Sequence, residues 1–261
     1  MNILFIGDIV GKPGRRIIRE ILYPLINQYQ VDFCIANAEN SAAGFGITQS
    51  VVHQLLDMGI DCLTSGNHIW DKKEIVEVLN LEPKLLRPAN YPQSTPGHSY
   101  GLFESKGGHR IGVLNLVGRV FMTCVDCPFQ VAEKILPILQ KDSRFILVDF
   151  HAEATSEKLA MGWYLDGRVT AVVGTHTHVQ TADNRILPHG TAYITDVGMT
   201  GPFDSIIGIQ KEAALNRFLT QIPQKFLIAN SNLAMNAVLI ECDPKTGHAL
   251  RIERIQMPLT S

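Results

Sequence analysis

Side chains of the types that bind metal ions recur at the ends of apolar runs in this 261-residue sequence. Five runs each end in, or are soon followed by, a carboxylate, an amide or an imidazole. The set comprises Asp8, Glu39, Asn40, Asn67, His151, His176 and His178. Asp8 or Asn67 taken alone would be interpreted as a cap or turn residue. Because ligands bind beyond the carboxyl ends of strands in open α/β sheets, five runs that end in this way predict one shared site.

The donor types predict a dinuclear metal centre. Seven donors exceed the four ligands of one tetrahedral zinc ion. They suit two ions about 3.5–4 Å apart that share a bridging carboxylate and a hydroxide. Imidazole is combined with oxygen donors and the set contains no thiolate, which favours two divalent transition-metal ions, iron or manganese before zinc. With Asp8, Glu39 and a hydroxide, such a centre keeps a formal charge of about +1, which attracts an anionic ester.

The predicted chemistry is hydrolysis of a phosphate ester by a hydroxide that the two ions generate. His68 lies beside the predicted ligand Asn67. As an imidazolium it could stabilise the phosphoryl oxygens or protonate the leaving oxygen, which would be a catalytic role. The alternative is that His68 only orients a metal ligand or the phosphate.

Other polar motifs receive structural interpretations. Asp71 and Glu74 resemble a capping box at the start of the next helix. Asp196 follows a further apolar run, and we expect it to support the site or the fold and not to bind metal. Cys124 and Cys127 form an isolated pair without a second half-site, so we favour a loop coincidence over a zinc or redox site.

The elements that must position these residues alternate between short apolar runs and helical patterns. Strands are predicted at 2–7, 32–38, 61–66, 145–150, 169–174 and 191–198. Antiparallel hairpins are predicted from SYGLFES with RIGVLNLVG and from NAVLIEC with ALRIERIQ. Parallel βα units combined with hairpins predict an α/β fold with two stacked mixed β-sheets flanked by helices. No linker divides the sequence, so we expect one domain over residues 1–261.

The composition excludes several classes of protein. Hydrophobic residues make up 46% and charged residues 18% of the chain, which is incompatible with extensive intrinsic disorder. The net charge of −2 gives no overall basic surface for long nucleic acid. No apolar run approaches the roughly 18 residues of a membrane span, and the first residues lack the pattern of a secretory signal. We therefore expect a cytoplasmic protein, and the low charged fraction favours a surface for homo-oligomer formation.

The metal-binding motifs and their order resemble the calcineurin-like metallophosphoesterase superfamily. The shared motifs are GD at 7–8, GNH at 66–68, a lone histidine at 151 and GTHTH at 174–178. The segments GDIVGKPGR, NAEN, GNHIWD, LRPANYP, HAEATSEK, GTHTHVQTAD and DVGMTGP resemble the YmdB-type bacterial phosphodiesterases over nearly the whole chain. Two motifs depart from the wider superfamily: Val10 replaces the usual histidine, and NAEN replaces the usual GDxxD.

The resemblance implies a four-layer α/β sandwich with a two-metal centre. One ion would be surrounded by Asp8, Glu39, Asn40 and His178. Glu39 would bridge to a second ion held by Asn67, His151 and His176, and His68 would be catalytic. The implied activity is hydrolysis of small phosphodiesters, including 2′,3′-cyclic nucleotides. Two alternatives stay open: a phosphomonoesterase on the same centre, and a regulatory nucleotide-binding protein with little turnover.

Overall fold

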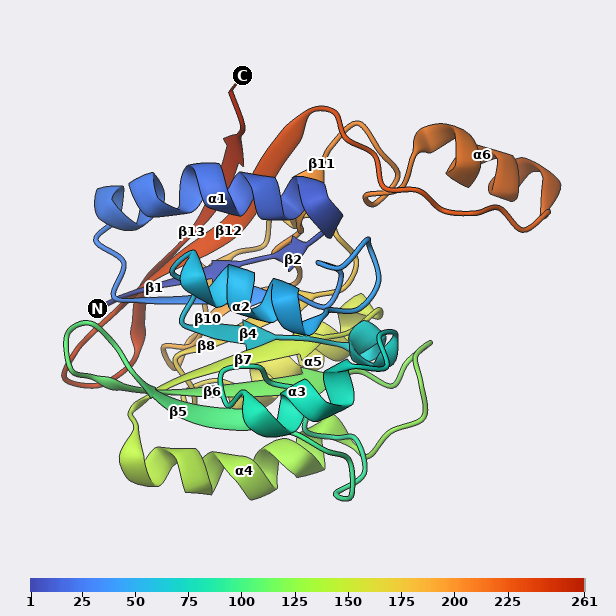
Figure 1. Cartoon of the computed structure of the whole chain (residues 1–261). Helices are drawn as coiled ribbons and strands as arrows, with labels where there is room; N and C mark the ends of the chain where they lie inside the picture. The colour runs from blue at the N-terminus through green and yellow to red at the C-terminus, as the bar shows by residue number, and fades with distance from the viewer. Residues whose placement is uncertain (261) are drawn as a thin grey trace.

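Two stacked β-sheets with helices on their outer faces form the body of the protein (Figure 1). The computed structural model describes residues 1–260. In the first sheet the strand order is β2-β11-β12-β1-β3-β4, and β13 pairs with β12. These strands are β1 (Asn2–Ile6), β2 (Asp8–Ile9), β3 (Phe33–Asn37), β4 (Cys62–Thr64), β11 (Met199–Pro202), β12 (Leu233–Cys242) and β13 (Ala249–Pro258). β1, β3 and β4 are parallel, whereas β12 is antiparallel to β1 and β13, so the sheet is mixed.

The second sheet is also mixed and has the order β5-β6-β7-β8-β10-β9. Its strands are β5 (Tyr100–Glu104), β6 (Arg110–Val117), β7 (Phe145–His151), β8 (Ala171–Thr175), β9 (Arg185–Ile186) and β10 (Ala192–Ile194). The four central strands are parallel, and β5 and β9 are antiparallel to their neighbours. Both predicted hairpins are present, as β5–β6 and β12–β13.

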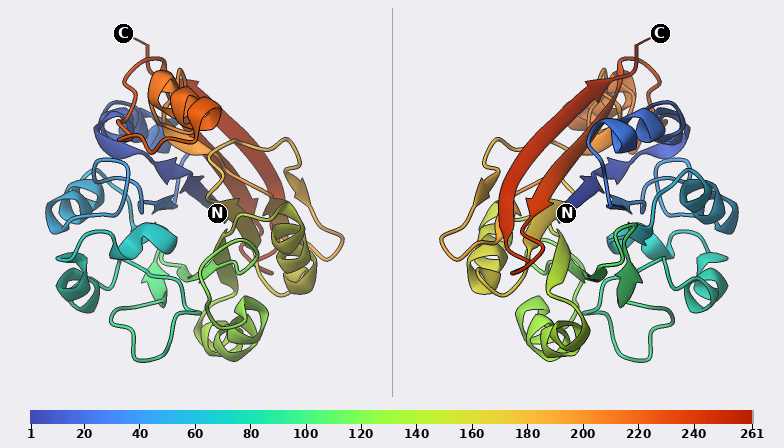
Figure 2. Two further views of the ribbon diagram at one scale, coloured as in Figure 1. Left: turned by 90° about the vertical axis from the view of Figure 1, so that its right-hand side faces the viewer. Right: turned by 90° about the vertical axis from the view of Figure 1, so that its left-hand side faces the viewer.

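The helices complete a four-layer sandwich. They are α1 (Gly11–Gln28), α2 (Gln49–Asp57), α3 (Ile75–Leu81), α4 (Pro128–Asp142), α5 (Thr155–Leu165) and α6 (Lys211–Thr220), with a short 3-10 helix η1 (Asn67–Trp70). α1, α2 and α3 pack on the first sheet, and α4 and α5 pack on the second. α6 stands apart from both sheets (Figure 1), and Figure 2 views the molecule along the direction in which α6 projects. The predicted fold class is confirmed.

Alternation along the strands explains why the runs are apolar throughout. In β1, Ile3 and Phe5 face the second sheet, whereas Leu4 and Ile6 face the helices. Successive side chains of a strand point to opposite faces, so a strand between two layers needs apolar residues at every position. The same alternation places Leu147 between the sheets and Val148 beneath the helices. The core therefore consists of three apolar layers, one between the sheets and one under each set of helices.

One predicted strand is shorter than expected, because the chain leaves the second sheet before the apolar run ends. The sequence pattern predicts a single strand over 191–198, which is wrong. β10 ends at Ile194 in the second sheet, and the chain then crosses to the first sheet, where β11 begins at Met199. Asp196 and Gly198 lie in this crossing, where the Asp196 Oδ1 accepts a 2.7 Å hydrogen bond from the Gly198 N–H.

Within residues 1–260, no helix has the length and hydropathy needed to cross a membrane.

We expect thiol reagents to label two of the five cysteines in the folded protein at pH 8. Cys34, Cys62 and Cys242 are buried, whereas Cys124 is exposed and Cys127 is partly exposed. Burial raises the pKa of all three buried thiols, that of Cys242 to about 12, which keeps them protonated, and the thiolate is the reactive form. Labelling of intact protein followed by mass spectrometry should show two modified thiols in buffer and five in denaturant. Rapid labelling of Cys34 in buffer would contradict the burial of this strand.

Candidate metal centre

The structure brings all seven predicted donors to one edge of the stacked sheets, where parallel strands of both sheets end. Asp8 begins β2 directly after β1, Glu39 and Asn40 follow β3, Asn67 begins η1 after β4, His151 ends β7, and His176 and His178 follow β8. Because these strands run in the same direction, their carboxyl ends meet at this edge. The predicted convergence is therefore a consequence of the parallel pairing in each sheet.

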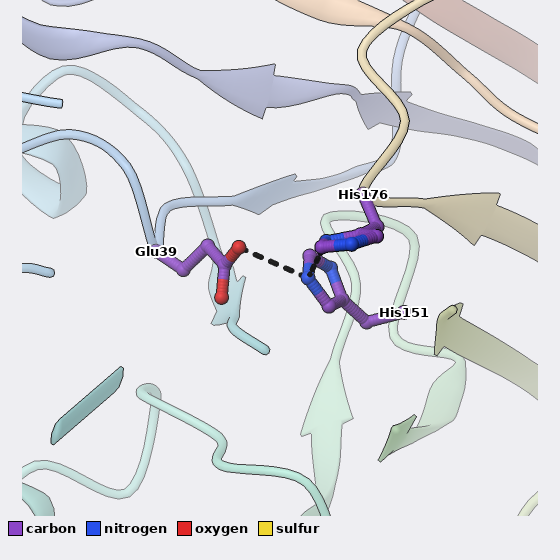
Figure 3. Close-up of side chains that lie close together, drawn as sticks. All are labelled: Glu39, His151 and His176. Atoms are coloured by element: carbon purple, nitrogen blue, oxygen red, sulfur yellow. Dashed lines mark hydrogen bonds and ion pairs between the residues drawn. The ribbon is translucent and has the colours of Figure 1, made fainter. Parts of the chain in front are cut away.

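The first donor group is built around the imidazole of His151. Its Nε2 lies 2.9 Å from Glu39 Oε1 and 3.0 Å from His176 Nδ1, and Figure 3 shows the three side chains pointing toward one another. Asn67 Oδ1 lies 3.1 Å from the same nitrogen. The ligand atoms of Glu39, His151 and His176 all lie within 4.8 Å of one another, a spacing that one metal ion could span.

The second donor group lies beside the first and contacts the same glutamate. His178 Nε2 is 3.9 Å from Asp8 Oδ1 and 3.0 Å from Asn40 Nδ2. Asn40 Nδ2 is in turn 3.4 Å from Glu39 Oε1. The seven side chains thus form two groups that share Glu39, which is the division that the family resemblance implies. The role of each residue as a ligand stays a prediction.

Two buried oxygen atoms without hydrogen-bond partners indicate that the donor set could bind cations. Among residues 1–260, Asp8 Oδ1 and Asn40 Oδ1 have no hydrogen-bond partner although both atoms are buried. A buried polar oxygen without a partner is costly, and a buried carboxylate more so. Both atoms belong to the second donor group, where coordination to a cation would satisfy them. The donor set and its geometry therefore fit the predicted metal centre.

Opposite charges dominate the electrostatics of this buried cluster. Burial disfavours the ionised form of Glu39, but the charge and hydrogen bonds of His151 and His68 lower the pKa of Glu39 to about 2. Burial likewise opposes the protonated form of His151, but the neighbouring Glu39 carboxylate raises its pKa to about 9. Burial and the His151 charge lower the pKa of His176 to about 3, and burial raises the pKa of Asp8. The cluster is thus rich in groups whose protonation a cation would change.

A chain of hydrogen bonds that the sequence analysis missed orients His151. Its Nδ1 lies 2.9 Å from Thr175 Oγ1, and the Thr175 hydroxyl donates to Asp149 Oδ1 at 2.8 Å. Asn37 Nδ2 donates to the other Asp149 oxygen at 3.1 Å. Because these contacts occupy Nδ1, Nε2 is directed at the cluster. The sequence did contain a sign of this support, because Asp149 is a carboxylate inside the apolar run FILVDF. It stands two residues before His151 and therefore lies on the same face of β7.

The loop that carries His176 and His178 is held in an uncommon backbone conformation. Both histidines have positive φ angles, 100° and 66°, which non-glycine residues rarely adopt. Asp196 holds the residue between them: its Oδ2 accepts from Thr177 N–H at 3.1 Å, from the Thr177 hydroxyl at 2.7 Å and from Lys158 Nζ at 2.7 Å. The predicted supporting role of Asp196 is confirmed. The sequence analysis missed Lys158, which supplies the buried counter-charge.

Glu153 is a further neighbour of the centre that the sequence analysis missed. Its Oε2 lies 3.1 Å from His176 Nε2, on the side of the ring opposite the nitrogen that faces His151. A carboxylate on the outer nitrogen of a ligating histidine fixes the tautomer and orientation of the ring. Glu153 follows the end of β7 by two residues, and this position after a strand is what could have identified it from the sequence.

His68 is held by contacts that overturn the capping-box interpretation of Asp71. Asp71 Oδ2 lies 2.9 Å from His68 Nδ1, and the His68 backbone N–H donates to Glu39 Oε2 at 3.0 Å. α3 begins only at Ile75 and has no side-chain cap, and Glu74 Oε1 accepts from the Gln49 N–H instead. The prediction failed because the chain forms η1 from within the GNH motif, so Asp71 lies one turn after His68 and contacts its ring, four residues before α3 begins.

A cavity of about 390 Å³ opens above the donors. Glu39, His68, His176 and His178 belong to its lining. The lining also has an apolar part, which includes Phe45, Ile207, Phe226 and Ile228 and which we call the apolar side of the cavity. This arrangement places the predicted catalytic histidine, the shared carboxylate and both loop histidines within reach of one small ligand.

We expect Gly66→Ala to disable the centre. A Cβ at residue 66 would lie 2.2–2.4 Å from three atoms of the His151 imidazole, which is far inside contact distance. The ring would have to leave its present position, in which its Nε2 contacts Glu39. We therefore expect metal content and turnover to fall together, with turnover at least about 100-fold lower. The matched control is Gly107→Ala, whose added Cβ would meet no atom closer than 3.6 Å. Wild-type metal content in Gly66→Ala, measured by elemental mass spectrometry, would contradict this packing.

Comparison with known proteins decides the family of the chain. The family described as YmdB-like protein matches residues 4–255. The chain belongs to the YmdB-like family. The resemblance noted from the motifs is therefore confirmed. The chain is also 51% identical over 255 residues to a Bacillus subtilis (strain 168) protein named 2′,3′-cyclic-nucleotide 2′-phosphodiesterase, and the alignment covers 98% of this chain and 96% of the relative.

Two solved structures of related proteins share the whole fold. The crystal structure of a hypothetical protein from Thermus thermophilus superposes with a TM-score of 0.92 at 41% identity, covering 99% of both chains. A Mycoplasma pneumoniae protein described as a novel phosphatase superposes with a TM-score of 0.93 at 37% identity, covering 99% of this chain and 93% of the other. Identity at this level over whole chains extends the likeness from the motifs to the complete architecture.

Proposed function

We propose that this YmdB-like protein is a metal-dependent phosphodiesterase that hydrolyses 2′,3′-cyclic nucleotides. The observation that carries the proposal is the pair of largely buried donor groups that share Glu39 at a cavity of about 390 Å³. The substrate class comes from the name of the Bacillus subtilis relative, with which the chain shares half of its residues over nearly its full length.

The proposed ligands are the seven donors at the strand ends. One ion would be held by Asp8, Asn40 and His178, a second by Asn67, His151 and His176, and Glu39 would contact both. Bound divalent ions supply Lewis-acid chemistry here, neutralising phosphoryl oxygens and lowering the pKa of a coordinated water. The donor types favour iron or manganese, followed by zinc.

Residues of the chain itself supply the proton that hydrolysis requires. The oxygen of water forms a bond to phosphorus and releases a proton, and the bond from phosphorus to one ribose oxygen breaks. That ribose oxygen gains a proton, so the proton released by the water balances the one that the acid delivers. Asp71 occupies Nδ1 of His68, which leaves Nε2 as the nitrogen that can deliver this proton. The backbone contact between His68 N–H and Glu39 Oε2 fixes the distance between the proton donor and the metal donors. The product is a nucleoside monophosphate.

A phosphomonoesterase activity on the same centre is the second candidate. The Mycoplasma pneumoniae relative with the same fold is described as a phosphatase. A monoester would use the same donors and the same proton from His68, but it carries one more negative charge than a cyclic diester. The two activities therefore differ in charge recognition and not in the position of the reacting atoms.

The test begins with metal content. Untagged protein purified without chelator is analysed by elemental mass spectrometry, and about two transition-metal ions per chain are expected. The loaded protein is then given 2′,3′-cyclic AMP and, separately, 3′-AMP. Faster release of inorganic phosphate from 3′-AMP than opening of the cyclic diester would favour the phosphomonoesterase. Recovery of tightly bound, unchanged cyclic nucleotide would favour the regulatory alternative, and failure to bind manganese, iron or zinc on reconstitution would overturn the mechanism.

A further inference from the structure

The apolar side of the cavity is assembled from two segments that are distant in the sequence. Phe45 lies in the loop after β3. Ile207, Ile209, Phe226 and Ile228 belong to the arm, which we define as residues 203–232, the segment between β11 and β12 that contains α6. Figure 1 shows α6 standing away from the body, to which both ends of the arm return. The arm therefore contributes a wall to the candidate active site.

The two segments are packed against each other. A Cβ at Gly44 would lie 2.4 Å from Cδ1 of Ile228, and Gly44 has a positive φ of 96°, so only glycine fits at this contact. The next residue, Phe45, contacts His68: the two rings meet edge-on, with 5.1 Å between the centroids. Phe45 thus contacts the predicted proton donor while the preceding residue contacts the arm, so the apolar side of the cavity adjoins the reacting centre.

Phe226 is positioned by α6. The Arg217 guanidinium lies 5.1 Å from the centroid of the Phe226 ring, within the range of a cation–π contact. Arg217 lies in the last turn of α6, and Phe226 is half-buried at the cavity. Through Arg217, α6 therefore contributes a contact that holds the Phe226 ring at the cavity.

We infer that this wall, formed by Phe45, Phe226 and the neighbouring isoleucines, is the subsite for the nucleobase and that it accepts all four bases. The inference rests on the proposed function and extends it to substrate selectivity. Stacking on aromatic rings tolerates every base because every base has a π-face. A cavity of about 390 Å³ lies within the range that holds a ligand of nucleotide size, so base and phosphate fit together.

The polar side chains of the cavity are already engaged. Thr177 donates both its backbone N–H and its hydroxyl to Asp196, and Glu153 contacts His176. The remaining polar lining residues are proposed metal donors or His68. Reading the edge of a base requires hydrogen-bond donors and acceptors directed at it, and discrimination among bases depends on them. The subsite therefore binds the base through apolar contact area and shape, without hydrogen bonds that would distinguish one base from another.

The test compares Phe226→Ala with wild type on two substrates in the metal-loaded enzyme. One is 2′,3′-cyclic AMP, and the other is methyl riboside 2′,3′-cyclic phosphate, which has the same diester and no base. We expect the preference in kcat/KM for the nucleotide over the base-free diester to fall by about 10-fold or more, mainly through KM. The control is Phe218→Ala, which removes an exposed phenylalanine of α6 outside the cavity and should leave the preference unchanged.

Two results would overturn the inference. One is an equal loss on both substrates in Phe226→Ala, and the other is a preference above 100-fold for one base among the four 2′,3′-cyclic nucleotides. If wild type turns over neither substrate, the proposed function fails, and calorimetry of adenosine binding still decides the subsite. Wild type should then bind adenosine more tightly than Phe226→Ala does, and equal binding by the two proteins would refute the subsite on its own.

Discussion

Glu39→Gln should lower turnover of 2′,3′-cyclic AMP by at least about 1,000-fold, the largest effect that we expect from a single side chain. The glutamate contacts both donor groups, and an amide lacks the negative charge that the proposed shared ligand would supply. Metal content should fall from about two ions per chain to one or none if Glu39 is the ligand that both ions would share. Steady-state kinetics and elemental mass spectrometry on the same preparation measure both quantities.

The matched control for this substitution is Glu74→Gln. Glu39 and Glu74 each accept a hydrogen bond from a backbone N–H, but Glu74 is exposed and does not contact the donor groups. Glu74→Gln should keep wild-type turnover and metal content. Thermal melting of both variants without metal establishes that each is folded. Two bound ions and wild-type turnover in Glu39→Gln would refute the proposed role of Glu39 as the ligand that both ions share.

His68→Ala should lower kcat by about 10²- to 10⁴-fold while metal content stays at the wild-type level. The side chain is proposed to deliver the proton to the leaving oxygen, and only its backbone contacts Glu39. The defect should shrink for a diester with a p-nitrophenolate leaving group, which needs no proton to depart. Comparison of kcat for the two substrates therefore separates loss of the acid from a general disturbance of the site.

Two further variants calibrate the effect of His68→Ala. Asp71→Asn removes the charge beside His68 Nδ1 but retains a hydrogen-bonding group, so a smaller loss of kcat is expected. His98→Ala removes an exposed imidazole outside the cavity and should have wild-type kinetics. An unchanged kcat in metal-replete His68→Ala would exclude His68 as the proton donor.

Much of this site could be predicted because its chemistry is encoded at strand ends. The apolar runs set the strands, and each of five runs ends at a donor. Parallel strands align their carboxyl ends, so local sequence was sufficient to place Asp8, Glu39 and His151 at one edge. The motif order, in particular GNH and GTHTH, further pointed to the family that the comparisons show. The layered fold followed from the same alternation of runs and helices.

Other features were decided only by the tertiary structure, because they depend on contacts between distant segments. Alternation along a strand could not show that residues 191–198 leave one sheet for the other. The pairing of β7 with β8 brings Thr175 beside His151, and a capping pattern could not anticipate that Asp71 would contact His68. The sequence by itself therefore determined the types of donor and the order in which they occur. Only packing between the two sheets and the arm decided which groups support the donors and which aromatic ring completes the cavity.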